Sequence, residues 1–335
     1  MKQLSLLGDD DEPERGDADA SGRRPGAVRP AAPDASVAAL AARLDTRLRL
    51  GTSSWSFPGW AGLVYAAGAA KQALSRDGLG AYATHPLLRT VGVDSGFYAP
   101  LDAGRLARWA DQVPPDFRFL VKAPALVTDR FRRESGGRIS GANPGFLDAG
   151  LAIDQAVGPY LEGLGEHAGV LLFQFPPLGR QVTGNPRRFA EDLYRFLRRL
   201  PAGPVYAVEL RDAGLLTPDL AAALHHGGAT AGLAGHPRLP ELAEQRDLFE
   251  GTVHGPLVIR WLLRRNRGYG EARDRYFPFD RLAEPDPQTR AAVAALIQDA
   301  LAAGREVFII VNNKAEGSSP LTLIELARSL PAPQE

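Results

Sequence analysis

Eight short segments of the chain are rich in apolar residues, in continuous runs or in alternation with polar residues, and each is typical of a buried strand. The clearest segment is 204–212, PVYAVELRD. With period two, Tyr206 and Val208 lie on one face of this predicted strand, whereas Ala207 and Glu209 lie on the other. The second face changes from apolar to ionic at its C-terminal end. A buried charge is costly unless it is paired or used, so this strand end marks a candidate site.

Predicted helices separate the predicted strands, and the alternation sets the fold class. The strands are expected at 48–53, 88–95, 117–122, 169–174, 205–211, 229–234, 257–262 and 306–312. The helices are expected at 71–82, 103–112, 146–164, 186–200, 218–225, 239–246, 287–303 and 321–330. Such alternation favours parallel strands joined by right-handed crossovers. Eight units favour a closed α/β barrel, the (β/α)8 or TIM barrel, formed as a single domain by residues 47–335.

The chain begins with an extension, residues 1–46, which differs in composition from the barrel. Residues 1 to about 35 are rich in Asp, Arg, Gly, Pro and Ala and lack apolar periodicity, which predicts disorder. Asp34 is a suitable N-cap for a helix through Arg43, with Val37 and Leu40 at helical spacing. Whether this helix packs on the barrel or stays solvated is left open by the sequence.

Charge and composition exclude several classes of protein. Lys plus Arg and Asp plus Glu both number 39, so no net charge attracts the chain to nucleic acid or to a membrane surface. There is no cysteine, which removes disulfides, thiolate nucleophiles and thiolate metal sites. No apolar run approaches the roughly 18 residues of a membrane span, and the first residues are too acidic for a signal peptide. We expect a cytoplasmic protein without a membrane or nucleic-acid partner.

Barrels of this class place their sites at the C-terminal ends of the strands, where this chain has a series of polar residues. They are Ser53, Asp94, Lys122, Gln174, Glu209, Arg211, Arg260 and Asn312 or Asn313. Trp55 and Tyr98 stand close enough along the chain to supply an aromatic wall. A polar group at the same end of seven strands indicates a functional ring, although an ion-pair network without chemistry would look the same in a sequence.

Each member of the ring has a chemistry that suits its type. Glu209 and Asp94 are candidates for general acid–base work. Lys122 is a candidate Schiff-base amine or electrostatic clamp. Arg211 and Arg260 are suited to a carboxylate or phosphate. We expect Glu209 to face the barrel mouth within salt-bridge reach of Lys122 or Arg260.

The remaining candidates are assigned to substrate binding or set aside. Gln174, Asn312, Asn313, Trp55 and Tyr98 are expected to contact a substrate through amides and rings. No metal and no cofactor are expected, because five of the six histidines fall at the opposite end of the predicted barrel. Magnesium held by the two carboxylates is the alternative. The arginine-rich segment 264–275 is interpreted as a solvated loop rather than a phosphate-binding lip.

Six motifs at these strand ends resemble those of a known family, the YecE-like proteins or domain of unknown function 72. They are GTSSWSFPGW (51–60), VDSGFY (93–98), FLVKAP (119–124), FQFPP (173–177), AVELR (207–211) and VNN (311–313). The resemblance covers about residues 47–330 and implies a TIM barrel, with no established activity. The family usually has Glu where this chain has Asp94, so a shared substrate does not follow.

These observations leave three functions open. The first is a metal-independent enzyme acting on a small, polar, anionic metabolite at the C-terminal face of the barrel. The second is a non-catalytic ligand-binding or interaction barrel that uses the same residues for recognition. A metal-dependent phosphoesterase is the least favoured, since it would need converging imidazoles.

Overall fold

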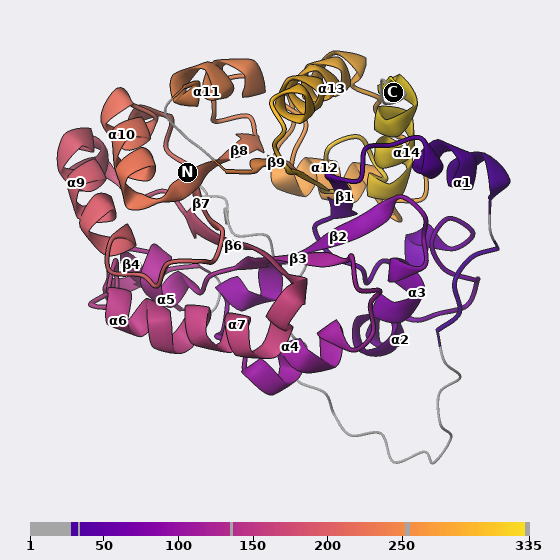
Figure 1. The fold of residues 1–335 in the computed structure, drawn as a ribbon, viewed down its shortest axis with the longest axis horizontal. Helices are drawn as coiled ribbons and strands as arrows, with labels where there is room; N and C mark the ends of the chain where they lie inside the picture. The colour runs from indigo at the N-terminus through magenta and orange to yellow at the C-terminus, as the bar shows by residue number, and fades with distance from the viewer. Residues whose placement is uncertain (1–27, 33, 135–136, 252–254, 332–335) are drawn as a thin grey trace.

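The computed structural model describes residues 28–32, 34–134, 137–251 and 255–331. Eight parallel strands form a closed barrel in the order β1-β2-β3-β6-β7-β8-β9-β10, and helices surround it (Figure 1). The strands are β1 Leu48–Thr52, β2 Leu88–Val93, β3 Arg118–Lys122, β6 Ala168–Phe175, β7 Tyr206–Leu210, β8 Ala229–Gly235, β9 Leu257–Trp261 and β10 Val307–Val311. Each lies in one of the apolar segments predicted to be a strand, so the predicted fold class is confirmed.

The helices also follow the expected order, with breaks that the pattern did not predict. They are α1 Ala35–Ala42, α2 Lys71–Asp77, α3 Leu79–Ala83, α4 Ala103–Ala110, α5 Ala125–Thr128, α6 Ala149–Ala152, α7 Gly158–Leu164, α8 Arg180–Thr183, α9 Pro186–Leu197, α10 Pro218–Gly227, α11 Leu242–Phe249, α12 Tyr269–Tyr276, α13 Pro287–Ala302 and α14 Ser319–Ser329. Gly78 separates α2 from α3. A π-helical turn, Ile153–Val157, joins α6 to α7 within the single helix expected there.

The inside of the barrel is a compact apolar layer contributed by alternate residues of the strands. Leu120, Val170, Leu172, Ala207, Val258, Phe308 and Ile310 form this interior cluster. The opposite strand faces pack against the helices in the larger core, where Val208 and Leu210 are buried. The alternation read from residues 204–212 therefore describes the inside and the outside of the barrel correctly.

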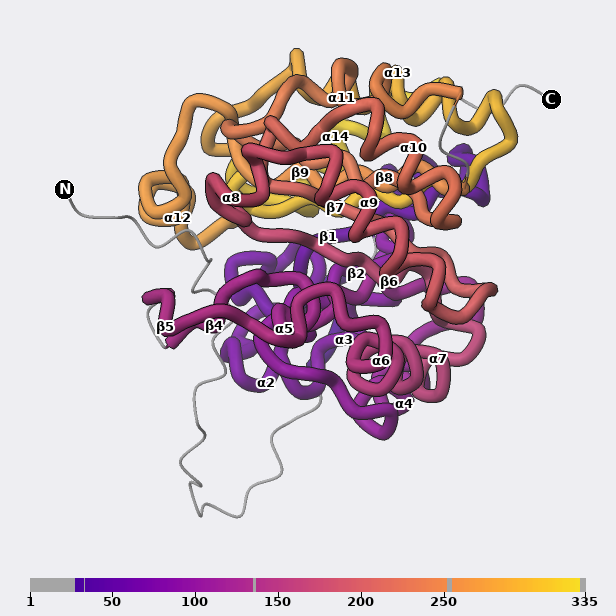
Figure 2. Tube along the Cα trace, turned by 90° about the vertical axis from the view of Figure 1, so that its left-hand side faces the viewer, coloured from indigo at the N-terminus to yellow at the C-terminus, as the bar shows by residue number. Residues whose placement is uncertain are grey.

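Three additions follow the C-terminal ends of strands and surround that end of the barrel. The hairpin β4–β5 (Phe131–Arg133 and Ile139–Ala142) comes after β3, α8 comes after β6, and α12 comes after β9. All three lie at the left of Figure 2. The sequence pattern predicted none of them, because each is short and lacks an apolar stripe of its own.

The first helix packs on the barrel instead of standing in solvent. Val37 and Leu40 are buried in the main core, and Arg43 donates a hydrogen bond to the carbonyl of Leu330 at the end of α14 (3.1 Å). Residues 29–31 also pair with the barrel, since Ala31 N–H donates to the carbonyl of Val64 (2.9 Å). This pairing corrects the expectation of disorder for these residues. The rest of that expectation, residues 1–27, lies outside the described residues.

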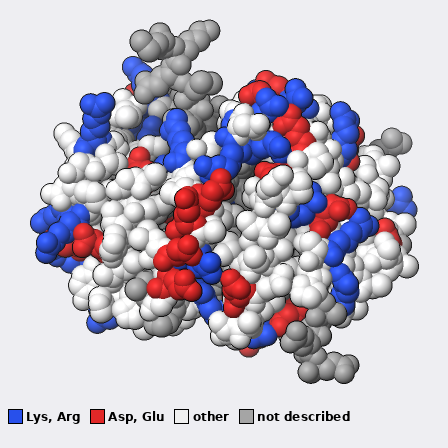
Figure 3. All heavy atoms as spheres, turned by 90° about the horizontal axis from the view of Figure 1, so that it is seen from above, with Lys and Arg blue, Asp and Glu red and all other residues white. Residues whose placement is uncertain are grey.

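Charged side chains on the described surface are largely paired. Figure 3 shows acidic and basic groups side by side on the face that carries α11 and α13. Arg246 of α11, for example, reaches Asp299 of α13 at 3.1 Å. Over the described part of the chain, no helix combines the length and apolar character needed to cross a membrane.

Candidate functional site

A ring of polar side chains lies one layer above the apolar interior of the barrel. Each member follows an interior residue by two positions, so it points inward at the C-terminal end of its strand. The pairs are Leu120 and Lys122, Leu172 and Gln174, Ala207 and Glu209, Val258 and Arg260, and Ile310 and Asn312. Strand periodicity alone therefore brings five of the predicted residues into one layer.

Arg260 lies at the centre of an ion-pair network in this layer. Its Nη2 is 2.8 Å from Asp94 Oδ1, and its Nη1 is 3.2 Å from Glu209 Oε2. Arg211 Nη2 approaches Glu209 Oε1 at 2.7 Å. Lys122 Nζ lies 3.8 Å from Asp94 Oδ1. The expected placement of Glu209 within reach of Arg260 is thus confirmed.

The position of Lys122 depends on a close contact between the end of β3 and the turn after β2. A Cβ on Gly96 would lie 2.5 Å from the carbonyl oxygen of Lys122, so only glycine allows the 3-10 turn Asp94–Phe97 to pack there. This packing places the Phe97 ring 4.3 Å from Lys122 Nζ. The amine is held between an aromatic face and a carboxylate.

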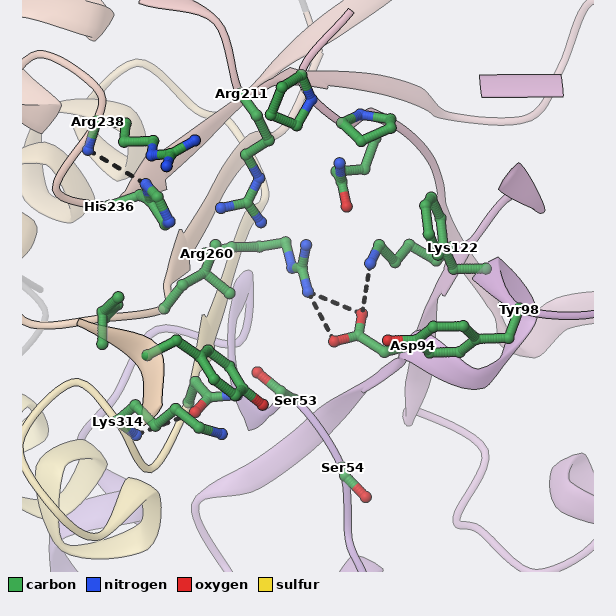
Figure 4. Close-up of a pocket in the computed structure, with 18 of the residues that line it drawn as sticks. Ser53, Ser54, Asp94, Tyr98, Lys122, Arg211, His236, Arg238, Arg260 and Lys314 are labelled. Atoms are coloured by element: carbon green, nitrogen blue, oxygen red, sulfur yellow. Dashed lines mark hydrogen bonds and ion pairs between the residues drawn. The ribbon is translucent and has the colours of Figure 1, made fainter. Parts of the chain in front are cut away.

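A cavity of about 140 Å³ opens above the network. Its lining includes the basic residues Lys122, Arg211, Arg238, Arg260 and Lys314 but one acidic residue, Asp94. In Figure 4, Lys122 and Asp94 approach from one side, whereas Lys314, His236 and Arg238 approach from the other. The polar lining also includes Ser53, Ser54, Gln174, Tyr98 and Asn312. Cations outnumber carboxylates here even when the buried Glu209 beneath Arg211 and Arg260 is counted.

Burial and neighbouring charges shift the pKa values of Lys122 and Asp94, which face each other. Burial lowers the pKa of Lys122 to about 8; Asp94 opposes this shift, whereas Arg260 and Arg211 add to it. Burial alone would raise the pKa of Asp94, but Arg260, Lys122 and Arg211 outweigh it and hold that pKa below its usual range. Near neutral pH the cavity therefore holds an ionised carboxylate beside an amine that can lose its proton.

His236 contributes a neutral imidazole. Burial, followed by the charge of Arg211, lowers its pKa to about 4. Its Nδ1 accepts a hydrogen bond from the backbone N–H of Arg238 (3.2 Å), so Nε2 carries the proton. This histidine is a hydrogen-bond donor rather than a cation at neutral pH.

Three predicted site residues do not line the cavity. Asn313 is buried, and its Oδ1 accepts from Trp60 Nε1 (3.2 Å) and from the backbone N–H of Ser319 (2.8 Å), so it holds the loop before α14. Trp55 packs edge-on against Trp109 in the helical layer, with ring centroids 5.3 Å apart. Both expectations of substrate contact are therefore corrected: their side chains point into the protein from positions just beyond the strands.

The third residue outside the lining is Glu209, although it belongs to the ring. Its side chain is completely buried beneath Arg211 and Arg260. A carboxylate in this position holds the two guanidinium groups and does not itself meet the cavity.

Sequence reasoning missed the part of the site that comes from loops. Arg238, Lys314 and Tyr269 all line the cavity, and Lys314 Nζ lies 4.2 Å from the centroid of the Tyr269 ring. These residues lie beyond the ends of β8, β10 and β9, where the period of two no longer determines which way a side chain points. The one available signal was a basic residue shortly after a strand end, which is common at protein surfaces.

The arginine-rich segment after β9 is paired within the protein. Arg267 and Arg275 contact Glu284 at 2.6 and 2.7 Å, and Tyr276 donates to the same carboxylate at 2.6 Å. Much of the segment faces solvent, as expected, but its arginines are ion-paired and part of it forms the helix α12 instead of a loop.

The carboxylates of the site are already engaged by arginine. Arg260 lies between Asp94 and Glu209 and contacts both, in the position that magnesium would need. Among the described residues, no three His, Cys, Asp or Glu side chains gather as a metal ion would require.

Comparison with known proteins identifies the family. The model of DUF72, described as a protein of unknown function, matches residues 49–335. No curated protein matches the chain. Two solved structures share its fold. A DUF72 family protein of Thermotoga maritima is 19% identical over 84% of this chain and 98% of its own, with a TM-score of 0.54. One of Enterococcus faecalis is 17% identical over 86% and 98%, with a TM-score of 0.52.

At these identities the two structures are evidence for the fold alone, whereas the family model covers most of the sequence. The ring of motifs at the strand ends and the closed barrel agree with that match. The chain belongs to DUF72, a family of proteins of unknown function.

Proposed function

We propose that this protein is an enzyme acting on a small, polar, anionic metabolite bound at the C-terminal end of the barrel. The observation that carries the proposal is the composition of the cavity lining, with five basic residues against one acidic residue. A carboxylate or phosphate would replace water in hydrogen bonds to these cations. The volume of about 140 Å³ suits a metabolite of a few carbons rather than a polymer.

The reacting groups in this proposal are Lys122 and Asp94. Lys122 has a pKa of about 8, near the working pH, as a base or nucleophile requires. Asp94, 3.8 Å away, is placed to exchange a proton with it. Arg211, Arg238 and Lys314 bind the anion, and Glu209 positions Arg211 and Arg260 without touching the substrate. Of the two carboxylates expected to do acid–base work, Asp94 keeps that role because it lines the cavity, whereas Glu209 does not line it.

One observation favours the second candidate, a barrel that binds an anion without transforming it. The carboxylates of Asp94 and Glu209 are both engaged by Arg260, so the network is internally compensated, as in a rigid recognition site. The two functions predict the same ligand and differ in turnover.

A thermal-shift screen tests the shared part of the proposal. Metabolites of a few carbons are tested as matched anionic, neutral and cationic compounds on the wild type, Arg238→Gln and Arg187→Gln. Arg238 is exposed and lines the cavity, and its guanidinium has no carboxylate partner in the described structure, so its loss should leave the fold intact. Arg187 lies on α9, away from the cavity, with a side chain that is 78% exposed.

We expect anions to raise the melting temperature of the wild type and of Arg187→Gln, and to do so less for Arg238→Gln. Product analysis of the stabilising anions then separates enzyme from binder. Stabilisation by neutral or cationic compounds, or an equal response from all three proteins, would contradict the anion site.

A further inference from the structure

Lysine is rare in this chain, and its distribution is uneven. Of 39 Lys plus Arg residues, lysine occupies four positions, 2, 71, 122 and 314, and all the others are arginine. Two of these four, Lys122 and Lys314, are buried and line the same cavity. Where the chain needs a positive charge for an ion pair it uses arginine almost everywhere, including Arg211 and Arg260 within the site.

An arginine would hold an anion at least as well as a lysine, through its two-pronged geometry. What an arginine does not do is lose its proton and attack a carbon atom, because guanidinium stays charged in proteins. The presence of lysine at these positions therefore indicates a use for the amine itself.

Of the two amines, Lys122 has the surroundings of a nucleophile. Burial and the two arginines of the network disfavour its charged form, against the opposing charge of Asp94, and its Nζ lies 3.8 Å from that carboxylate, which can relay a proton. Aromatic rings stabilise an ammonium ion at both positions, since Phe97 lies 4.3 Å from Lys122 Nζ, and Tyr269 and Phe279 lie 4.2 and 5.9 Å from Lys314 Nζ. The burial, the carboxylate and the arginines around Lys122 make it the better suited of the two to react.

We propose that Lys122 captures an anionic aldehyde or ketone as an imine, with the other cations of the cavity holding its carboxylate or phosphate. This inference rests on the proposed function and names its substrate class. Near pH 8 a large part of Lys122 has lost its proton to solvent, and the neutral Nζ attacks the carbonyl carbon. A C–N bond forms, and Asp94 relays a proton from the nitrogen to the carbonyl oxygen. The hydroxyl of this carbinolamine takes a second proton from solvent, its C–O bond breaks, one water leaves, and a protonated imine remains on Lys122. Hydrolysis reverses each step, and no oxidant or reductant takes part.

Reductive trapping tests the proposal directly. The intact protein is incubated at pH 8 with cyanoborohydride and one of three aldehydes: glyoxylate, glycolaldehyde phosphate or neutral glycolaldehyde. Peptide mass spectrometry then assigns the adducts to individual lysines, with the exposed Lys71 as an internal reference. The two anionic aldehydes distinguish a carboxylate from a phosphate ligand, and glycolaldehyde shows what the charge adds.

We expect Lys122 to be labelled at least roughly tenfold faster than Lys71 by one or both anionic aldehydes, and the ratio of Lys122 to Lys71 labelling to be clearly smaller with glycolaldehyde. Lys122→Arg should abolish this adduct, and Arg187→Gln, on the surface of α9 away from the cavity, should keep it on Lys122. Equal labelling of Lys71 and Lys122, or preferential labelling of Lys314, would overturn the assignment.

A parallel measurement separates this inference from the proposed function. The shift in melting temperature produced by inorganic phosphate is recorded for the wild type and for Lys122→Met. A phosphate response in the wild type without a Lys122 adduct refutes the imine and leaves the anion site standing. If the wild type shows neither a phosphate response nor a Lys122 adduct, the proposed function is refuted as well.

Discussion

At the scale of single residues, the site brings charges together where water is largely excluded. The side chains of Arg260 and Glu209 are 1% and 0% exposed, and that of Lys122 is 9% exposed. Such an arrangement is stable only while every charge keeps its partner, because an unpaired buried ion costs several kcal/mol. Substitution of each charged residue should therefore have its own measurable effect on stability or ligand binding.

Lys122 should make the stability of the protein depend on pH. The unfolded chain keeps this proton up to about pH 10.5, whereas the folded protein keeps it to about pH 8. Below pH 8 the folded state therefore carries the full cost of the buried charge, and the cost is relieved as the pH rises from 8 to 10.5. Compared with Lys122→Met, the wild type should gain up to about 3 kcal/mol over this range.

Urea unfolding of both proteins at pH 7 and pH 10.5 measures this gain, since groups common to the two cancel in the difference. Lys71→Met is the matched control, because Lys71 is exposed. A constant difference between wild type and Lys122→Met across these pH values would show that Lys122 has an ordinary pKa.

Asp94→Asn should separate anion binding from chemistry. The substitution keeps the shape of the side chain but removes the one acidic group from the cavity lining. Repulsion of an anionic ligand falls, so we expect phosphate to bind several-fold more tightly, while turnover or imine formation at Lys122 is lost. Isothermal titration with phosphate and the trapping reaction measure the two effects. Weaker phosphate binding would mean that Asp94 supports the ligand instead of opposing it.

Glu209→Gln should destabilise the fold. Its carboxylate compensates Arg211 and Arg260, and glutamine would leave three buried or half-buried cations against Asp94 alone. The expected loss at pH 7 is roughly 3–5 kcal/mol of unfolding free energy. Glu191→Gln, on the surface of α9, should stay within about 0.5 kcal/mol of the wild type. If Glu209→Gln were as stable as this control, the network would not depend on its carboxylate.

At the scale of elements, short apolar segments located all eight strands, because each strand buries one face in the barrel interior and the other against helices. Asp34 caps α1 as predicted, accepting from the backbone N–H of Ser36 at 2.8 Å. The β4–β5 hairpin, α8 and α12 escaped prediction because long-range contacts order them. Glu284, for instance, lies outside α12 and pairs with Arg275 in this helix and with Arg267 just before it.

The packing of α1 gives a test at this scale. Leu40 is 8% exposed and belongs to the main core, whereas its neighbour Ala39 is exposed. Leu40→Ala should lower the unfolding free energy by about 2–3 kcal/mol, and Ala39→Gln should change it by less than about 0.5 kcal/mol. Denaturant unfolding of the two variants compares them directly. If Leu40→Ala were as stable as Ala39→Gln, α1 would lie in solvent, which is the alternative that the sequence left open.

At the scale of the whole molecule, the barrel places residues from distant parts of the sequence into one layer. Asp94 and Arg260 are 166 residues apart and in contact. The fold class, the inward-facing residues at the strand ends and the contact of Glu209 with Arg260 could be predicted from the sequence, because period two fixes which residues point inward. Arg238, Lys314 and Tyr269 could not, because loops place them, and Asn313 was wrongly expected in the cavity for the same reason.

The central claim is that the cavity at the strand ends is an anion site, and an anomalous difference map tests it most directly. Crystals soaked in selenate, a divalent oxyanion with a strong selenium signal, would show where such an anion binds. We predict that the highest peak lies in the cavity, within hydrogen-bond distance of Lys122 or Arg211, and that glyoxylate or phosphate in the soak displaces it. A cavity without selenate, with peaks confined to surface arginines, would contradict the account.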